Sequence, residues 1–241
     1  YEAKAEAVKG EWAHRNPGYA AMIESLDDNV GRLLKKLDEL AIADQTVVIF
    51  ASDNGGLVLP SSPWGPVTSN WPLRSGKGSA YEGGVRVPLI VHWPGATVAG
   101  AVDGTEVISA DIYPTILEIA GVVDPNETTD GLSLVSTLRG ESPLVRDALY
   151  WHYPHYHPGG ASPYGAVRVG RYKLIEYFED MRVELYDLDE DIGEFINLAS
   201  TLPEQTVRLL EMLHAWQSEV GAQMPTENPD YDPARALNFT R

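Results

Sequence analysis

The chain has 241 residues, of which 44% are hydrophobic and 22% are charged, a composition typical of folded globular proteins rather than disordered ones. Its formal net charge of −17 disfavours nucleic acid and anionic membrane surfaces as partners, because both would repel an acidic protein. No apolar run approaches the roughly 20 residues of a membrane span, and no signal peptide is recognisable at Tyr1. The chain contains no cysteine, which excludes disulfide bonds but leaves the cellular compartment open.

The amino-terminal part predicts a helix followed by a strand. Apolar residues recur at spacings of three and four along residues 17–40, and Asn16 followed by Pro17 is a typical helix start. The apolar stripe consists of Tyr19, Ile23, Leu26, Val30, Leu33, Leu37 and Leu40. The apolar run 46–51 then predicts a strand that is buried on both faces, as is usual in a parallel α/β sheet.

The middle of the chain predicts a long surface loop within an α/β domain. Residues 55–80 hold several Gly, Pro and Ser residues and little periodicity, and loops of this length in compact domains are usually functional or disordered. We expect a strand at residues 87–92, with His92 in the core. A helix is expected at residues 111–120, with Gly121 as its stop signal.

Beyond residue 145 the pattern predicts a small antiparallel sheet and one helix. Strands are expected at 164–169 and 172–177 around a two-residue hairpin turn, and at 183–188. A capping box at Thr201–Glu204 indicates a last helix. Its apolar stripe would be Val207, Leu210, Leu213, Trp216 and Val220. The expected division is therefore 1–144, 145–220 and an extended tail at 221–241.

Two hard oxygen ligands stand where the first strand ends. Asp53 and Asn54 are followed by Gly55 and Gly56, which let the backbone turn sharply. Ligands of open α/β sheets gather outside the carboxyl ends of the strands. A plain polar turn is the alternative, because the same residue types commonly start loops.

A dense group of histidines and aromatic residues lies in a proline-bounded segment. The group consists of Trp151, His152, Tyr153, His155, Tyr156 and His157. Its imidazoles are compatible with zinc, although no thiolate or further ligand stands out. Stacking and hydrogen bonding to sugar rings, or packing between subdomains, are the alternatives.

Several motifs follow one another in a fixed order: Tyr19–Gly31, Asp53-Asn54-Gly55-Gly56, Leu73–Pro88, Asp111–Leu117, Asp130–Leu134, Tyr172–Ile175 and Glu184–Leu188. In this order they resemble the sulfatase family of the alkaline-phosphatase-like superfamily, over residues 19 to about 217. The resemblance implies an α/β fold. This would be part of an alkaline-phosphatase-like sandwich, a mixed sheet flanked by helices, followed by a small antiparallel sheet with one packed helix.

The resemblance also implies roles for particular residues. Asp53 and Asn54 match calcium ligands, and Lys77 matches the lysine that contacts the sulfate. Arg74 would face the same anion or form a structural ion pair with Glu82. The region of His155 and His157 would reach the rim of the active site and contact the substrate.

The family's nucleophile is missing from this chain. A C/S-x-P-x-R motif that is matured to formylglycine is absent, as are the Asp pair that completes the metal site and a histidine that protonates the leaving group. The chain therefore resembles the carboxy-terminal half of a calcium-dependent sulfatase, with the amino-terminal half as its partner. Alone it is expected to be inactive.

The implied reaction is hydrolysis of sulfate esters, on a carbohydrate or polysaccharide. Such a substrate is a polyanion, so a local basic site must outweigh the net charge. This is feasible because charges farther apart than about 8 Å are largely screened at physiological salt. A phosphodiesterase or phosphonate hydrolase of the same superfamily and a non-catalytic carbohydrate-binding or assembly fragment are the alternatives. The resemblance implies a periplasmic or secreted location.

Overall fold

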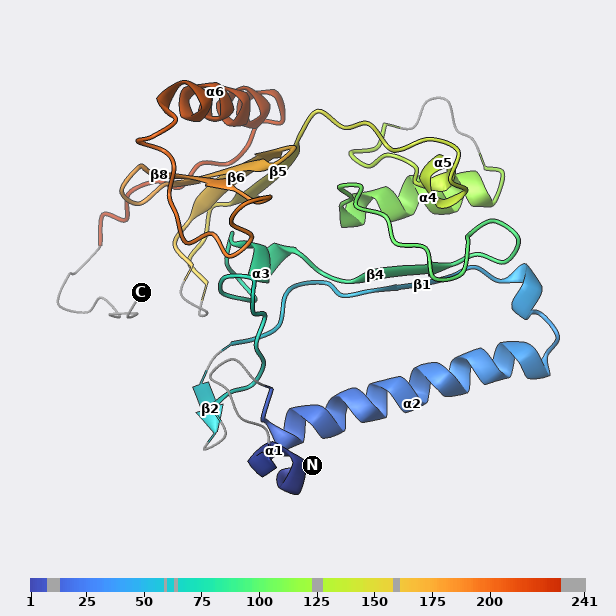
Figure 1. Ribbon diagram of the computed structural model, residues 1–241. Helices are drawn as coiled ribbons and strands as arrows, with labels where there is room; N and C mark the ends of the chain where they lie inside the picture. Colours follow the sequence, from blue (N-terminus) through green and yellow to red (C-terminus); the bar gives the residue numbers. More distant parts are fainter. Residues whose placement is uncertain (8–13, 59, 63–64, 123–127, 158–160, 231–241) are drawn as a thin grey trace. The chain divides into compact units, whose positions relative to one another are not determined.

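The computed structural model describes residues 1–7, 14–58, 60–62, 65–122, 128–157 and 161–230 (Figure 1). Its helices are α1 (Glu2–Ala7), α2 (Pro17–Glu39), α3 (Glu82–Val85), α4 (Ile112–Ile119), α5 (Val135–Leu138) and α6 (Pro203–Glu219), with 3-10 turns η1 (Ala43–Gln45) and η2 (Ser109–Asp111). Its strands are β1 (Val48–Ala51), β2 (Pro60–Ser62), β3 (Gly65–Pro66), β4 (Leu89–His92), β5 (Leu149–Tyr153), β6 (Tyr164–Val169), β7 (Tyr172–Tyr177) and β8 (Arg182–Asp187).

Contacts divide the chain into two compact units. Unit 1 contains Tyr1–Tyr19, Asn54–Val87 and Ala148–Arg241, and unit 2 contains Ala20–Asp53 and Pro88–Asp147. One boundary lies close to the division expected at residue 145. Residues 54–87, however, group with the carboxy-terminal sheet rather than with the rest of 1–144.

Unit 1 is built on a four-stranded antiparallel sheet with the order β5-β6-β7-β8. β6 and β7 span the residues that the alternation predicts. Gly170 adopts a φ of 54° in the turn between them, a conformation that glycine reaches without steric cost. The third predicted strand, β8, begins one position early, at Arg182. The predicted small sheet with one packed helix is confirmed, and Figure 1 shows α6 lying over one face of it.

The sheet is covered on both faces, so alternate residues of each strand enter two different cores. Under α6, Val167, Leu174 and Leu185 pack against Leu209 and Leu213. On the opposite face, Ala80 and Tyr81 of the long loop pack against a second cluster. The strand residues of that cluster are Tyr164, Ala166, Ile175, Tyr177 and Tyr186. The long loop is therefore part of the core of unit 1.

Helix α6 differs from its prediction at its start and in its buried face. It begins at Pro203 with Leu202 as N-cap and no side-chain cap, so the predicted capping box is wrong. The buried positions are Leu209, Leu213 and Gln217, whereas Val207 and Val220 are exposed. A sheet that contacts the helix through Leu209 and Leu213 leaves Val207 on the solvent side, although it is apolar.

Unit 2 contains α2, the β1–β4 pair, α4 and α5. β1 pairs with β4 in antiparallel register, and its residues are half-buried or exposed, so the predicted parallel strand buried on both faces is wrong for the described residues. His92 in β4 is exposed rather than in the core. The α4 prediction is confirmed, with Gly121 at a φ of 69° just beyond the end.

Helix α2 forms where the apolar stripe predicts it, but much of the stripe is exposed. The Asn16 side chain accepts a hydrogen bond from the Tyr19 N–H at 3.0 Å, which is the predicted cap. No residue of α2 is buried, and the stripe residues Ile23, Leu26 and Leu33 are all exposed. Among the helices that the structure describes, none combines the length and apolar character needed to span a bilayer.

The packing of α6 generates a test. Leu213→Ala should lower the free energy of unfolding by about 2–5 kcal/mol, because it opens a cavity at a fully buried position. Val207→Ala is the matched control at a position that is 54% exposed, and it should change stability by no more than about 0.5 kcal/mol. Denaturant-induced unfolding measures both variants, and a larger effect at Val207 would contradict the observed face.

Candidate functional site

Two glycine-containing segments of unit 1 interlock through their backbones. The Lys77 N–H donates to the Gly56 carbonyl at 3.1 Å, and the Gly55 N–H donates to the Gly84 carbonyl at 3.0 Å. A Cβ on Gly55 would collide with the Gly83 carbonyl, so this approach requires a residue without a side chain. The two segments therefore form one rigid backbone platform. We call it the glycine bed; it consists of Gly55, Gly56, Lys77, Gly83 and Gly84.

Asn70 holds the two segments together, a role that no sequence motif indicates. Its Nδ2 donates to the carbonyls of Gly56 and Ser75, both at 2.9 Å, and its Oδ1 accepts from the Gly56 N–H at 3.1 Å. One amide side chain thus bridges the two segments on the side of Lys77.

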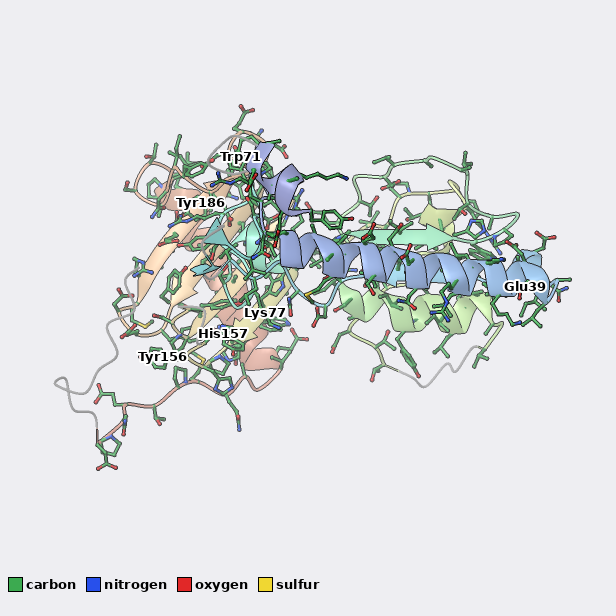
Figure 2. The ribbon with its side chains drawn as sticks, turned by 90° about the horizontal axis from the view of Figure 1, so that it is seen from below. Glu39, Trp71, Lys77, Tyr156, His157 and Tyr186 are labelled. Atoms are coloured by element: carbon green, nitrogen blue, oxygen red, sulfur yellow. The ribbon has the colours of Figure 1, made fainter. Side chains whose placement is uncertain are left out.

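Lys77 is exposed on this bed, next to His157 (Figure 2). Gly78, at a φ of 89°, lies so close to the His157 ring that a Cβ there would collide with it. Within the part of the chain that the structure describes, no carboxylate forms an ion pair with the Lys77 ammonium, in contrast to Lys36 and Lys173. The structure therefore brings two of the predicted site residues, Lys77 and His157, together.

The other histidines of the aromatic segment lie in different surroundings. His155 is exposed, with the ring of Tyr153 5.5 Å away in an edge-on arrangement. His152 contacts the Gln223 carbonyl through Nε2 at 2.8 Å and packs against Phe178, so it ties β5 to the chain beyond α6. Within the described ranges, no three His, Asp or Glu side chains gather closely enough to hold a metal ion.

Arg74 is half-buried and engaged by the core of unit 1. Its guanidinium stacks over the Tyr81 ring at 3.9 Å, and its Nη1 donates to the Tyr186 hydroxyl at 3.1 Å and to the Glu194 carbonyl at 2.7 Å. The suggested ion-pair partner, Glu82, instead binds Arg86 and Lys173. The role of Arg74 as a substrate ligand stays a prediction.

Asp53 and Asn54 stand at the boundary between the units: Asp53 ends one segment of unit 2 and Asn54 begins one of unit 1. Asp53 is exposed. The Asn54 Nδ2 donates a hydrogen bond to the Gly55 carbonyl at 2.9 Å. This bond uses the NH₂ end of the side-chain amide, whereas a cation would bind its oxygen. A carboxylate and an amide oxygen fit a hard cation such as calcium, which takes six to eight oxygen ligands. Two residues supply only a part of such a shell.

A buried charge cluster beneath the bed was not visible in the sequence. Lys173 of β7 lies 2.9 Å from Glu82 Oε1 and 3.1 Å from Glu194 Oε1, and all three side chains are at most 2% exposed. Burial raises the pKa of the Glu194 carboxyl, and Lys173 offsets this only in part. Burial also acts to raise the pKa of Glu82, but Lys173 and Arg86 together lower it.

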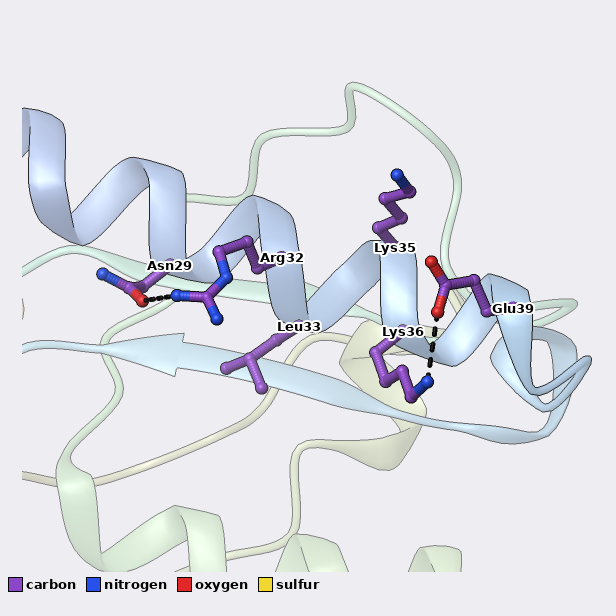
Figure 3. Close-up of a pocket in the computed structure, with 6 residues that line it drawn as sticks. All are labelled: Asn29, Arg32, Leu33, Lys35, Lys36 and Glu39. Carbon is purple, nitrogen blue, oxygen red and sulfur yellow. Dashed lines mark hydrogen bonds and ion pairs between the residues drawn. The ribbon is translucent and has the colours of Figure 1, made fainter.

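A hollow on the surface of α2 is lined by Asn29, Arg32, Leu33, Lys35, Lys36 and Glu39 (Figure 3). Arg32 donates to Asn29 at 3.0 Å, and Lys36 pairs with Glu39 at 3.1 Å. Every lining residue comes from one helix, so the hollow has no opposing wall that could enclose a ligand.

The glycine bed can be tested by adding a single methyl group. Gly55→Ala should lower the free energy of unfolding by about 1–3 kcal/mol, because the two segments must separate to accommodate the Cβ. Gly104→Ala is the control, since nothing lies within 4 Å of a Cβ at that position. If thermal unfolding shows equal effects for both variants, the close approach at Gly55 is not a constraint.

Two family models match the chain. Residues 1–122 match the model "Sulfatase", and residues 76–219 match the model "N-sulphoglucosamine sulphohydrolase, C-terminal". The chain is 40% identical over 240 residues to a sulfatase from Formosa agariphila, covering 89% of this chain and 42% of that protein. It is 33% identical over 228 residues to human arylsulfatase A, covering 86% of this chain and 44% of that protein. The chain thus spans less than half the length of these relatives.

Solved structures show the same likeness. A structure in complex with its substrate D-glucosamine-2-N,6-O-disulfate matches with a TM-score of 0.72 at 26% identity, over 93% of this chain and 46% of that one. A putative sulfatase from Bacteroides fragilis matches with a TM-score of 0.70 at 25% identity, over 89% of this chain and 45% of that one. These neighbours confirm the predicted alkaline-phosphatase-like fold class, and with the family models they show that the chain belongs to the sulfatase family.

Proposed function

We propose that this chain is part of an enzyme that hydrolyses sulfate esters on a carbohydrate. The observation that carries the proposal is the exposed Lys77 on its glycine bed, with the neighbouring Gly78 lying against the His157 ring. A compact ammonium flanked by glycines can approach an anionic oxygen without obstruction. The relatives named above are sulfatases, and one structural neighbour has a disulfated glucosamine as its substrate.

Lys77 would stabilise the negative charge that develops on the sulfate group and on the leaving oxygen. Such a fixed positive group needs no reorganisation during the reaction, which makes it effective in a transition state. His157, held against Gly78, and the exposed His155 would donate or accept hydrogen bonds from the sugar that carries the sulfate. The acidic chain would thus use a local basic site for a polyanionic substrate.

Asp53 and Asn54 would hold a calcium ion through a carboxylate and an amide oxygen, with further ligands from an amino-terminal portion of the sulfatase domain. When bound, the ion would polarise the sulfate group as a Lewis acid. The nucleophile, a formylglycine, would come from the same portion, because this chain contains no cysteine and no matching serine motif. The chain alone would therefore be inactive. The periplasmic or secreted location of the enzyme stays a separate prediction.

The exposed apolar residues of unit 2 support such a partner. Ile23, Leu26 and Leu33 of α2 are exposed, as are Phe50 of β1 and Ile90 of β4. Exposed apolar side chains that recur along one helix and one strand pair are typical of surfaces that another segment covers. We propose that the amino-terminal portion of the sulfatase domain covers them.

Replacing the lysine tests the function. In an active preparation that contains this chain and a formylglycine-bearing amino-terminal portion, Lys77→Ala should lower kcat on a sulfated sugar by about 100- to 1000-fold, as loss of one transition-state donor does. Lys35→Ala, at an exposed lysine of α2, should leave kcat unchanged. Sulfate release is measured directly. Near-normal turnover by Lys77→Ala would remove this residue from the reaction, and no turnover by any preparation would contradict the sulfatase proposal.

A further inference from the structure

The loop that carries Lys77 is held at both ends by one residue far along the chain, Glu194. Before Lys77, the Arg74 guanidinium donates to the Glu194 backbone carbonyl at 2.7 Å. After Lys77, the Glu82 N–H donates to the Glu194 carboxylate at 2.6 Å. The Gly83 N–H closes the loop by donating to the Arg74 carbonyl at 2.9 Å. Glu194 therefore fixes the distance between the two ends of the loop.

Lys173 makes the burial of this clamp possible. The Glu82 and Glu194 carboxylates are both fully buried, and a buried charge without a partner is strongly destabilising. The Lys173 ammonium lies within 3.1 Å of both carboxylates, and Arg86 adds a bond of 2.6 Å to Glu82. Lys173 is thus the cation shared by both carboxylates, and Arg86 adds a second cation at Glu82.

Two cations of the sheet, Lys173 and Arg168, lie on the face opposite α6. Lys173 shares that face of β7 with Ile175 and Tyr177, whereas Leu174 packs under α6. Arg168 of β6 stands directly opposite Lys173, and two like charges in this position repel each other. Glu82 lies 2.9 Å from Lys173 and 3.9 Å from Arg168, so the loop provides the anion that this pair of strands requires.

Glu194 also adopts a backbone conformation that is unfavourable for its residue type. Its φ is 54°, in the left-handed region that costs about 1–2 kcal/mol for a residue with a side chain. Such a conformation persists where the surrounding interactions determine it strongly. Glycine would relieve the strain, but it would remove the carboxylate that binds Glu82 and Lys173.

We propose that Glu194, neutralised by Lys173, is a positioning residue for Lys77. It acts through the loop Arg74–Glu82 and does not touch the substrate. The part of this inference that concerns catalysis rests on the proposed role of Lys77 in sulfate binding. The part that concerns the loop rests only on the contacts of unit 1.

The loop can be tested on the chain itself by hydrogen exchange. Glu194→Gln keeps the size of the side chain but removes its charge. It should speed amide exchange in residues 74–84 by about tenfold or more, as expected when a charge-assisted hydrogen bond is lost, and leave α6 unchanged. Glu176→Gln is the matched control: Glu176 is a buried carboxylate of β7, the strand of Lys173, but it pairs with His214 of α6 at 2.8 Å. It should leave exchange in residues 74–84 unchanged.

A double variant shows whether Lys173 and Glu194 act as one unit. Lys173→Met alone leaves the buried Glu194 carboxylate without its cation and should speed exchange in the loop more than Glu194→Gln does. Combining Lys173→Met with Glu194→Gln removes that unpaired charge, so the loop should be better protected than in Lys173→Met alone. Additive losses in the double variant would overturn the role of Lys173, because independent sites add.

Kinetics then separate positioning from stability. In an active sulfatase preparation, Glu194→Gln should lower kcat by about tenfold or more with a smaller change in KM, whereas Glu176→Gln should leave both unchanged. Uniform loss of protection across unit 1, or an unchanged loop, would overturn the proposal. If the wild-type preparation has no turnover, the proposed function fails, while the exchange comparison still decides whether Glu194 holds the loop.

Discussion

The burial of Lys173 between Glu82 and Glu194 is the interaction on which unit 1 depends. A charge that leaves water must find partners within hydrogen-bonding distance, and here those partners come from positions 82 and 194, on either side of Lys173 in the sequence. This requirement brings a loop, a strand and a turn into one core. It gives a physical reason why residues 54–87 group with the carboxy-terminal sheet rather than with the segments that flank them in the sequence.

The two faces of the four-stranded sheet consequently have different structural roles. The face under α6 is built mainly of apolar residues, with Glu176 paired to His214 of the helix, and its contribution is stability. The opposite face carries Arg168, Lys173 and Glu184 among its aromatic residues, and each of these charges contacts the long loop or a residue bound to it. The small sheet therefore does more than pack against α6. It is the surface against which the loop of Lys77 is shaped, and this links the stability of the sheet to the geometry of the proposed site.

Much of the fold could be predicted because it depends on local patterns. Alternation and the glycine turn gave β6 and β7 residue by residue, and the apolar stripe with Asn16 gave α2. Errors arose where the outcome depends on a partner. Which side of α6 faces the sheet determines that Leu209 is buried and Val207 is exposed. Likewise, the apolar run at β1 does not specify whether its neighbouring strand is parallel or antiparallel. Lys173 and Glu194 were missed because charged residues in a strand and a turn ordinarily face solvent.

The same limits explain which parts of the site could be predicted. Asp53, Asn54 and Lys77 lie in short motifs whose residue types indicate the chemistry proposed for them. Asn70 and Glu194, which hold the backbone before and after Lys77, have ordinary types and act only through distant contacts. A lysine that binds an anion gains affinity when its backbone is already fixed, because less conformational freedom is lost on binding. Glycines permit the close approach of the ammonium but would make an unsupported loop flexible. A loop that needs both properties must obtain its rigidity from outside, and the carboxylate of Glu194 with the amide of Asn70 supplies it.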